Sequence, residues 1–494
     1  MVLTKADSRM LGTSRSLYVA QFLLYGLFVI IGEAGLLASI CYHYQDGWFT
    51  FETAVALVFL IAAAALFFML WSRAHKKEQT LFILVATPLL AGFALFMMPF
   101  AVPDEFTHIN RVFDNRSACP LTTPAQLLDA YAWIDTYQTL GGFLALDFDY
   151  SLTKETEFCA STYSEINYLP PALVVAVGKL FGINGYVLIF VARLSNAALY
   201  LAACYWMIGR LPFGKKLAFV FLLNPMLLQQ EASCSADALC NIAILCFFVQ
   251  LIAMRFGRES HFPKREWFVL FAFAVLVAVC KYVYLPLLLS AIILYPKIRS
   301  TAVKKALPVV IVALMIGAVA FVVLRGYGDS LSRLLGTFQV DTFFGSLGAT
   351  TAQEGVTMLW QFAGGNLGWP YMNYVDAGAT VRVPVVWTVF LALLVLAAFA
   401  SADEKAAFKR WERICLVAVG LFEIIVVFAA LWMGAEGAVT WLQGRYFIPP
   451  AFLLLYALVL SRPTRLDRIP VTAFAVAMLA INAFSLMTVI RWFW

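Results

Sequence analysis

Runs of about twenty apolar residues recur along the whole chain, and they restrict what it can fold into. A stretch of that length crosses the hydrocarbon core of a bilayer as an α-helix, whereas barrel strands read as shorter segments of alternating polarity. The 494 residues are 63% hydrophobic and 13% charged, against about 25% charged in soluble domains. The sequence therefore predicts an all-α polytopic membrane protein, a single integral domain over residues 1–494. We expect membrane lipids, and no nucleic acid, among its partners.

Basic residues indicate how the apolar runs are oriented. They gather in six short segments, which the positive-inside rule places in the cytoplasm: Arg73–Lys77, Arg210–Lys216, Arg255–Arg265, Lys297–Lys305, Lys405–Arg413 and Arg462–Arg468. Counting between them predicts about thirteen transmembrane helices, with the C-terminus outside. The expected spans are 17–40, 53–71, 81–101, 185–208, 217–231, 237–254, 267–280, 282–296, 306–324, 385–400, 414–433, 446–461 and 470–490. We expect the first run to be a retained anchor and the protein to be a multi-pass protein of the bacterial cytoplasmic membrane.

Two segments do not fit full single spans. The apolar stretch between the basic segments ending at Arg265 and beginning at Lys297 is broken at Cys280–Pro286. Because both flanks are cytoplasmic, it must cross out and back as two short helices or re-enter partway, with Lys281 at the outer tip. The run Pro170–Phe181 is short, so we expect an interfacial or re-entrant helix.

Two long outer loops are predicted, over residues 102–169 and 325–384. The first holds ten acidic and three basic residues together with several aromatic ones, so we expect it to fold onto the membrane face. It also contains Cys119 and Cys159. An oxidising exterior permits a disulfide between them, and the sequence leaves the pairing open.

A charged motif follows the third apolar run, in Pro103-Asp104-Glu105-Phe106-Thr107-His108-Ile109-Asn110-Arg111. Ionisable groups at a membrane boundary are costly, so a cluster of them is a site hypothesis. A helix cap explains one carboxylate. It does not explain the pair of carboxylates together with His108 and Arg111 at helical spacing, so we predict a functional site here.

Three other turns lie at the same predicted membrane face and depth as this motif. They carry Ser233 and Asp237, Lys281 and Tyr282, and Arg445 and Tyr446. These residues also have structural explanations. Asp237 could cap the helix of the next span, and basic side chains on the outer side could extend to the membrane interface. Basic residues outside oppose the positive-inside bias, however, which favours a role in binding an anion. The candidate binding residues are His108, Arg111, Ser233, Asp237, Lys281, Tyr282, Arg445 and Tyr446.

This arrangement suits transfer from a lipid phosphate. A carboxylate such as Asp104 can accept a proton from an acceptor hydroxyl, and Lys or Arg can hold the phosphate that leaves. Asp104, Glu105 and His108 could also hold a divalent ion, Mg²⁺ or Mn²⁺, although no spaced ligand set confirms one.

The motif with Asp104, Glu105, His108 and Arg111 resembles that of a bacterial predicted-membrane-protein family, domain of unknown function 2142. Later blocks are similar too: Asn167-Tyr168-Leu169-Pro170-Pro171, Arg193-Leu194-Ser195-Asn196, Asn224-Pro225-Met226 through Asp237, and Gly444-Arg445-Tyr446-Phe447 followed by Pro449. Phe106 departs from the proline expected there. That family resembles the GT-C superfamily of multispanning glycosyltransferases, which use polyprenyl-phosphate-linked sugars. The resemblance implies a GT-C-like fold, Asp104 as the leading base, and Glu105 as base partner or metal ligand.

The sequence-based hypothesis is therefore an enzyme. It would be a GT-C-like glycosyltransferase moving a sugar from a polyprenyl-phosphate donor to an extracytoplasmic glycan, lipid or protein acceptor. A transporter or flippase of lipid-linked sugars is the main alternative, although the charges cluster at one face and no convincing repeat is present. An envelope polysaccharide polymerase or ligase is a nearer alternative. Glu33, Arg193 and Glu423 lie inside spans, and we expect them to face the bundle interior, either in structural pairs or in a functional role.

Overall fold

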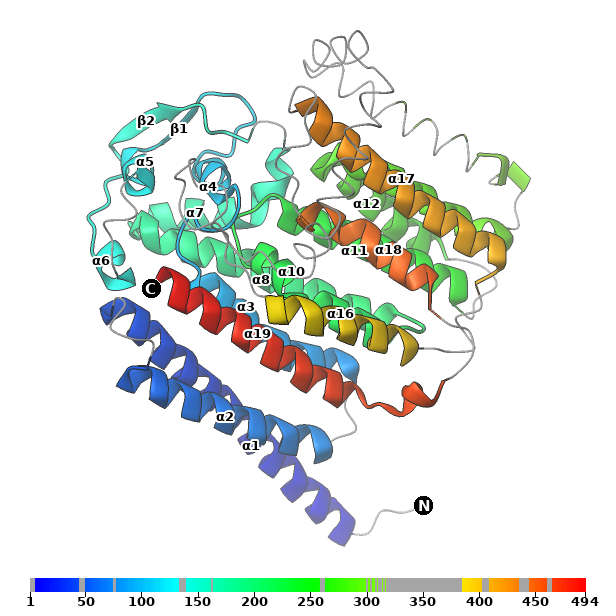
Figure 1. The fold of residues 1–494 in the computed structure, drawn as a ribbon, viewed down its shortest axis with the longest axis horizontal. Coiled ribbons are helices and arrows are strands. Elements are labelled where there is room, and N and C mark those ends of the chain that lie inside the picture. The colour runs from blue at the N-terminus through cyan, green and yellow to red at the C-terminus, as the bar shows by residue number, and fades with distance from the viewer. Residues whose placement is uncertain are drawn as a thin grey trace.

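Long helices lie side by side in the computed structural model, and a small mixed region covers one end of the bundle (Figure 1). The structure describes residues 5–43, 49–73, 77–132, 139–160, 163–257, 263–298, 384–401, 408–434, 444–459 and 464–494, with isolated positions between 301 and 316. The predicted span 306–324 and the second long loop, 325–384, fall almost entirely outside these residues.

Most predicted spans correspond to described helices. Those of the bundle are α1 (Lys5–Tyr42), α2 (Phe51–Arg73), α3 (Glu78–Phe96), α8 (Gly185–Arg210), α9 (Lys215–Leu222), α10 (Pro225–Glu231), α11 (Asp237–Phe256), α12 (Lys264–Cys280), the 3₁₀ helix η3 (Tyr282–Lys297), α16 (Pro384–Phe399), α17 (Arg410–Gly434), η6 (Gly444–Phe447), α18 (Ile448–Ala457), η7 (Arg465–Arg468) and α19 (Val471–Phe493). The third span was predicted too long, since α3 ends at Phe96 rather than near residue 101.

Seven of the described helices are long and apolar enough to cross a membrane individually. Their central member, α11, is buried along its whole apolar window, whereas α1 and α2 form a hairpin at the edge in which only a minority of the residues in each apolar window are buried (Figure 1). Apolar exposure of that extent suits contact with lipid. The protein is thus an all-α polytopic membrane protein, as predicted, and the count of thirteen spans stays a prediction.

One predicted span is two helices. The run 217–231 divides into α9 and α10 at Asn224-Pro225. Proline lacks an N–H and disfavours helical geometry in the preceding residue, so a continuous helix ends there. The Asn224 side chain then accepts a hydrogen bond from the Met226 N–H at 3.0 Å and caps α10.

The segment around Lys281 runs to one end of the bundle and returns, as the sequence predicts. Helix α12 ends at Cys280, Lys281 is extended with φ −158°, and η3 begins at Tyr282. Both halves pack against α11. Lys281 therefore sits at the tip of this turn.

The described residues between 97 and 184, which are 97–132, 139–160 and 163–184, fold into a structured cap on that end, and we name that end of the bundle the cap face (Figure 1). Its elements are α4 (Glu105–Phe113), β1 (Leu121–Pro124), α5 (Ala125–Ala132), α6 (Leu140–Leu144), β2 (Thr153–Thr156), the 3₁₀ turn η2 (Glu165–Tyr168) and α7 (Leu169–Leu180). The strands pair antiparallel with Leu121 opposite Thr156, and a disulfide joins Cys119 to Cys159 beside them. The described part of the first long loop is folded, as predicted.

Helix α7 has one packed face and one exposed face. At Gly178 an added Cβ would lie 2.2 Å from the Leu188 side chain, so only glycine permits this close approach to α8. Leu173, Val177 and Leu180 are exposed at helical spacing on the other side. A short helix with one open apolar face fits the predicted interfacial helix.

Candidate functional site

The chain turns sharply at Asp104. This residue has φ 62° and ψ 4°, in the left-handed region that Asp tolerates better than most residues, and α4 begins immediately after it. The turn sends the neighbouring Asp104 and Glu105 side chains to different partners, so the predicted carboxylate pair does not act as one unit.

Glu105 forms a buried ion pair with Arg193 of α8. Arg193 donates through Nε to Oε1 at 2.8 Å and through Nη2 to Oε2 at 2.5 Å, and neither side chain is exposed. The Cys234 N–H also donates to Oε1 at 3.2 Å. Because both oxygens are occupied and buried, the predicted roles of Glu105 as base partner or metal ligand do not fit this geometry.

Arg193 also fixes the end of α3. It donates to three backbone carbonyls there, those of Ala94 at 3.1 Å, Met97 at 2.7 Å and Met98 at 3.1 Å. The last carbonyls of a helix have no intrahelical partner, so the guanidinium satisfies groups that burial would otherwise leave unpaired. Glu105 and Arg193 together anchor the segment that presents Asp104.

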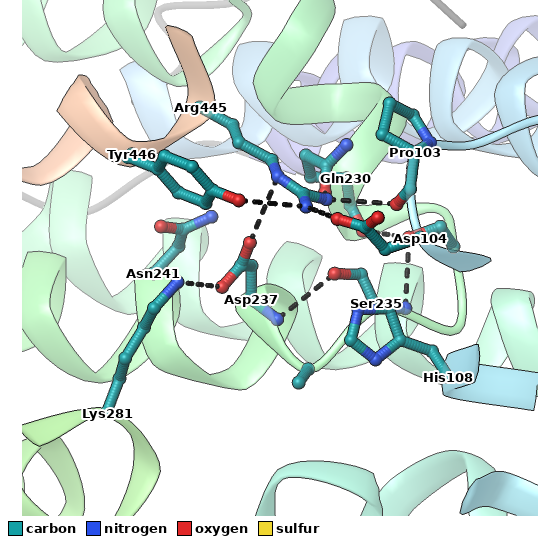
Figure 2. A network of polar contacts seen from close by, with 12 residues as sticks. Pro103, Asp104, His108, Gln230, Ser235, Asp237, Asn241, Lys281, Arg445 and Tyr446 are labelled. Carbon is teal, nitrogen blue, oxygen red and sulfur yellow. Dashed lines mark hydrogen bonds and ion pairs between the residues drawn. The ribbon is translucent and has the colours of Figure 1, made fainter. Parts of the chain in front are cut away.

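Asp104 is held by Arg445, which comes from η6 far along the chain. Arg445 Nη2 forms an ion pair with Asp104 Oδ2, while Nη1 donates to the Pro103 carbonyl at 3.0 Å and to Gln230 Oε1 at 3.2 Å (Figure 2). Tyr446 Oη lies 3.5 Å from Nη2. The Asp104 side chain is 39% exposed and that of Arg445 only 3%, so the carboxylate reaches the surface and its partner does not.

Asp237 joins this pair to Lys281. Lys281 Nζ donates to Asp237 Oδ1 at 2.8 Å, and Arg445 Nε lies 3.4 Å from Asp237 Oδ2 (Figure 2). The Asp237 N–H donates to Ser235 Oγ at 3.2 Å, so the start of α11 aims this carboxylate at both cations. Asp104, Arg445, Asp237 and Lys281 form a chain of alternating charge, which we call the charge chain.

Three tyrosine rings surround the Lys281 ammonium. Its Nζ lies 5.4 Å from the ring centre of Tyr163, 5.3 Å from that of Tyr284 and 4.7 Å from that of Tyr446. Burial lowers the pKa of Lys281, but the Asp237 carboxylate and the three tyrosines together raise it, and the pKa lies above its ordinary value. Lys281 is therefore a permanent cation at neutral pH, and ring faces attract it further.

His108 is buried against the cap. Its Nδ1 lies 2.8 Å from Tyr168 Oη. Burial lowers the pKa of His108 to about 4; the Asp104 carboxylate opposes that shift and Arg445 adds to it. The imidazole is therefore neutral at pH 7.

Other predicted site residues support the fold around the charge chain. Arg111 is buried, packs on the Tyr168 ring at 5.1 Å, and donates to the Tyr163 carbonyl at 3.3 Å. Ser233 Oγ donates to the Gln230 carbonyl at 2.7 Å within the turn before α11. Tyr282 is half-buried at the start of η3, and the described hydrogen bonds do not join it to the charge chain.

The sequence argument did not assign Gln230, Tyr163 or Tyr284 to the site, and it placed Arg193 in the bundle interior without naming its partner. Arg193 carried a signal, since a charge inside a span requires a partner, and a carboxylate near the end of α3 was available. Tyr284 donates through Oη to the Tyr446 carbonyl at 3.1 Å, and it lies two residues from the tyrosine that was chosen. The available signal was its position in the break at Cys280–Pro286, three residues after Lys281.

The predicted metal ligands do not come together. Among the described residues, the cluster of possible ligand atoms is Cys119, Glu157 and Cys159, and the two sulfurs there are joined in the disulfide. Glu105 faces Arg193, and Asp104 faces Arg445. The donor set therefore does not fit a divalent ion at Asp104, Glu105 and His108.

These observations define a class, the multi-pass membrane proteins with a charge-balanced polar network at one end of the helix bundle. Residues 143–456 match the family described as predicted membrane protein (DUF2142), and the chain belongs to this family. Asp237, Lys281 and Arg445 lie inside the matched residues, whereas the motif 103–111 precedes them. No curated protein and no solved structure matches the chain, and the likeness to the GT-C superfamily stays a prediction.

Proposed function

We propose that this protein is a membrane glycosyltransferase that uses a sugar linked to a polyprenyl phosphate. The acceptor hydroxyl oxygen forms a bond to the anomeric carbon of the sugar, and its proton passes to the Asp104 carboxylate. The bond between the anomeric carbon and the phosphate oxygen breaks, and its electron pair leaves with the lipid phosphate. A positioned base and nearby cations are what this step requires.

The observation that carries the proposal is the pairing of a partly exposed Asp104 with a buried Arg445. A carboxylate that reaches the surface can meet an acceptor hydroxyl. The guanidinium beside it offers the planar donor fork that suits phosphate, and Lys281 supplies a second positive charge.

We further propose that the cap face is the outer face of a bacterial cytoplasmic membrane. The described helix ends that carry Arg210, Lys264 and Arg410 lie at the opposite end of the bundle from Asp104. The positive-inside rule puts such ends in the cytoplasm. An extracytoplasmic glycan, lipid or protein acceptor would then approach Asp104 from the cap side.

The test is transfer by purified protein in lipid nanodiscs. Radiolabelled polyprenyl-phosphate sugars are incubated with cell-envelope acceptors, and wild type is compared with Asp104→Asn. Asp129→Asn is the matched control, since it removes one carboxylate from an exposed ion pair with Lys154 in the same cap. We expect wild type and the control to transfer label and Asp104→Asn to lose at least about a hundredfold in rate.

Three results would overturn this proposal. Equal rates for wild type and Asp104→Asn would remove Asp104 as the base. Absence of transfer with every donor, combined with movement of labelled lipid across vesicles, would favour the transporter or flippase. Formation of long polymers from a lipid-linked oligosaccharide would instead favour the polymerase or ligase.

A further inference from the structure

Both cations of the charge chain are already neutralised by carboxylates of the same chain. Arg445 is shared between Asp104 and Asp237, and Lys281 donates to Asp237. With His108 neutral, two positive and two negative charges balance at this site. A phosphate that binds here therefore has to replace one of the carboxylates rather than fill a vacant anion site.

The guanidinium of Arg445 has few donors left to offer. Its two Nη atoms contact Asp104, the Pro103 carbonyl and Gln230, and Nε faces Asp237. Arginine carries five N–H donors in a rigid fork, so a bidentate contact to phosphate needs two adjacent donors to be released together.

The Asp104 and Asp237 carboxylates differ in how easily each can be displaced from Arg445. Asp237 is only 6% exposed, receives a hydrogen bond from Lys281, and starts the buried helix α11. Asp104 is 39% exposed and stands on the turn before α4. Removing a buried carboxylate from a cation costs several times more than turning an exposed one into water, so Asp104 is the group that moves.

We propose that the phosphate of a lipid-linked donor displaces the Asp104 carboxylate from its ion pair with Arg445. Binding of the donor thereby releases the carboxylate that acts on the acceptor. This inference rests on the proposed function and adds an order to it. The carboxylate is engaged while the site is empty and becomes available as a proton acceptor once the phosphate is in place. Donor binding then precedes activation of the acceptor.

A counterintuitive result distinguishes this exchange from an ordinary binding site. Because Asp104 competes with the phosphate, Asp104→Asn weakens the competitor, and the variant should bind the phosphate more tightly than wild type. A charge-assisted hydrogen bond is about twice as strong as a neutral one, so we expect a gain of about tenfold in affinity. If Asp104 instead helped to hold the phosphate, its loss would leave the affinity unchanged or lower.

The experiment measures binding of farnesyl phosphate to the full-length protein in nanodiscs by isothermal titration calorimetry. Wild type, Asp104→Asn, Arg445→Gln and the control Asp129→Asn are compared. We expect about tenfold tighter binding for Asp104→Asn, wild-type affinity for the control, and at least tenfold weaker binding for Arg445→Gln. Equal or weaker binding by Asp104→Asn overturns the proposal.

Two further probes identify the source of the phosphate. Inorganic phosphate and phosphatidic acid in the nanodisc are titrated in parallel. Tight binding of farnesyl phosphate alone supports a polyprenyl carrier, whereas equal binding of phosphatidic acid or of inorganic phosphate overturns the lipid-donor part of the proposal.

A measurement on wild type avoids dependence on variant folding. Carbodiimide coupling to the Asp104 carboxyl, followed by mass spectrometry, should rise at least threefold when farnesyl phosphate is added, whereas coupling at Asp129 should not change. If coupling at Asp104 does not rise while phosphate binds, the exchange is wrong. If sugar is transferred but coupling at Asp104 does not rise, the exchange is refuted and the proposed glycosyltransferase activity is not. If coupling at Asp104 rises but no sugar is transferred, the glycosyltransferase activity is refuted and the exchange is not.

Discussion

The ion pair between Glu105 and Arg193 offers the sharpest test of how the site is built. In Glu105→Gln the Arg193 guanidinium keeps its charge at a position with no exposure, and the new amide N–H₂ faces another donor. Breaking a buried ion pair by removing one partner costs about 3–5 kcal/mol. At about 2.1 cal/mol/K per residue, the entropy of unfolding of a chain of 494 residues is about 1 kcal/mol/K. Dividing the loss of stability by this entropy gives a fall of about 3–5 °C in the melting midpoint.

The assay exploits the buried cysteines. Thiols such as those of Cys204, Cys240 and Cys246 are buried in the bundle, so a thiol-reactive dye reports unfolding in detergent. Asp129→Asn is the control, because an exposed ion pair contributes at most about 1 kcal/mol. A midpoint for Glu105→Gln within 1 °C of this control would refute the argument that the pair anchors the cap to the bundle.

A double-mutant cycle separates the pair from its other contacts. Arg193→Met leaves the Glu105 carboxylate unpaired and also removes the donor of three carbonyls, so it should cost more than Glu105→Gln. The double variant removes both charges and should lose less than the sum of the single variants. Additive losses would show that the two side chains are not coupled.

Three other predictions follow from the site and the cap. Because the pKa of buried His108 is about 4, below its ordinary 6.5, the fold loses stability as pH falls from 6.5 towards 4. Between pH 7 and 5 the loss in the free energy of unfolding is about 2 kcal/mol. The melting temperature of wild type should therefore fall more steeply with pH than that of His108→Gln, and parallel curves would contradict this. Cys119→Ser opens a loop closed over a separation of 40 residues and should cost the cap about 3–4 kcal/mol, seen as faster proteolysis of the cap; an unchanged cleavage rate would count against it. An impermeant maleimide applied to intact cells should label Asp129→Cys and not Arg465→Cys, relative to wild type, and the reverse pattern would invert the proposed orientation.

The bundle was largely predictable because bilayer physics leaves few choices. Apolar runs give spans, and the basic segments give the direction of each run. The short run Pro170–Phe181 was recognised because its length cannot cross a membrane, and α7 has the open apolar face expected of it. The division at Asn224-Pro225 was missed although proline signals it, because the hydropathy of the run is continuous across the break.

The site was predictable only in part, because the partners of charged groups are set by tertiary contacts. The four turns were expected to converge, and each of them contributes one residue to the charge chain. Sequence neighbours were wrongly expected to act together, since Asp104 and Glu105 are adjacent but point to Arg445 and to Arg193. Which carboxylate is buried depends on the left-handed turn at Asp104, and no local pattern reveals that conformation.

The long separation between Asp104 and Arg445 has a consequence for biogenesis. The two residues are 341 positions apart, so at a synthesis rate of about 5–20 residues per second Asp104 is made roughly 20–70 seconds before its partner. During that interval the carboxylate has no Arg445 to pair with, although Glu105 can already find Arg193. The anchor of the cap can thus form early on the ribosome, while the charge chain closes only after the C-terminal helices have inserted. A translation product that stops short of Arg445 would carry an assembled cap and an incomplete site.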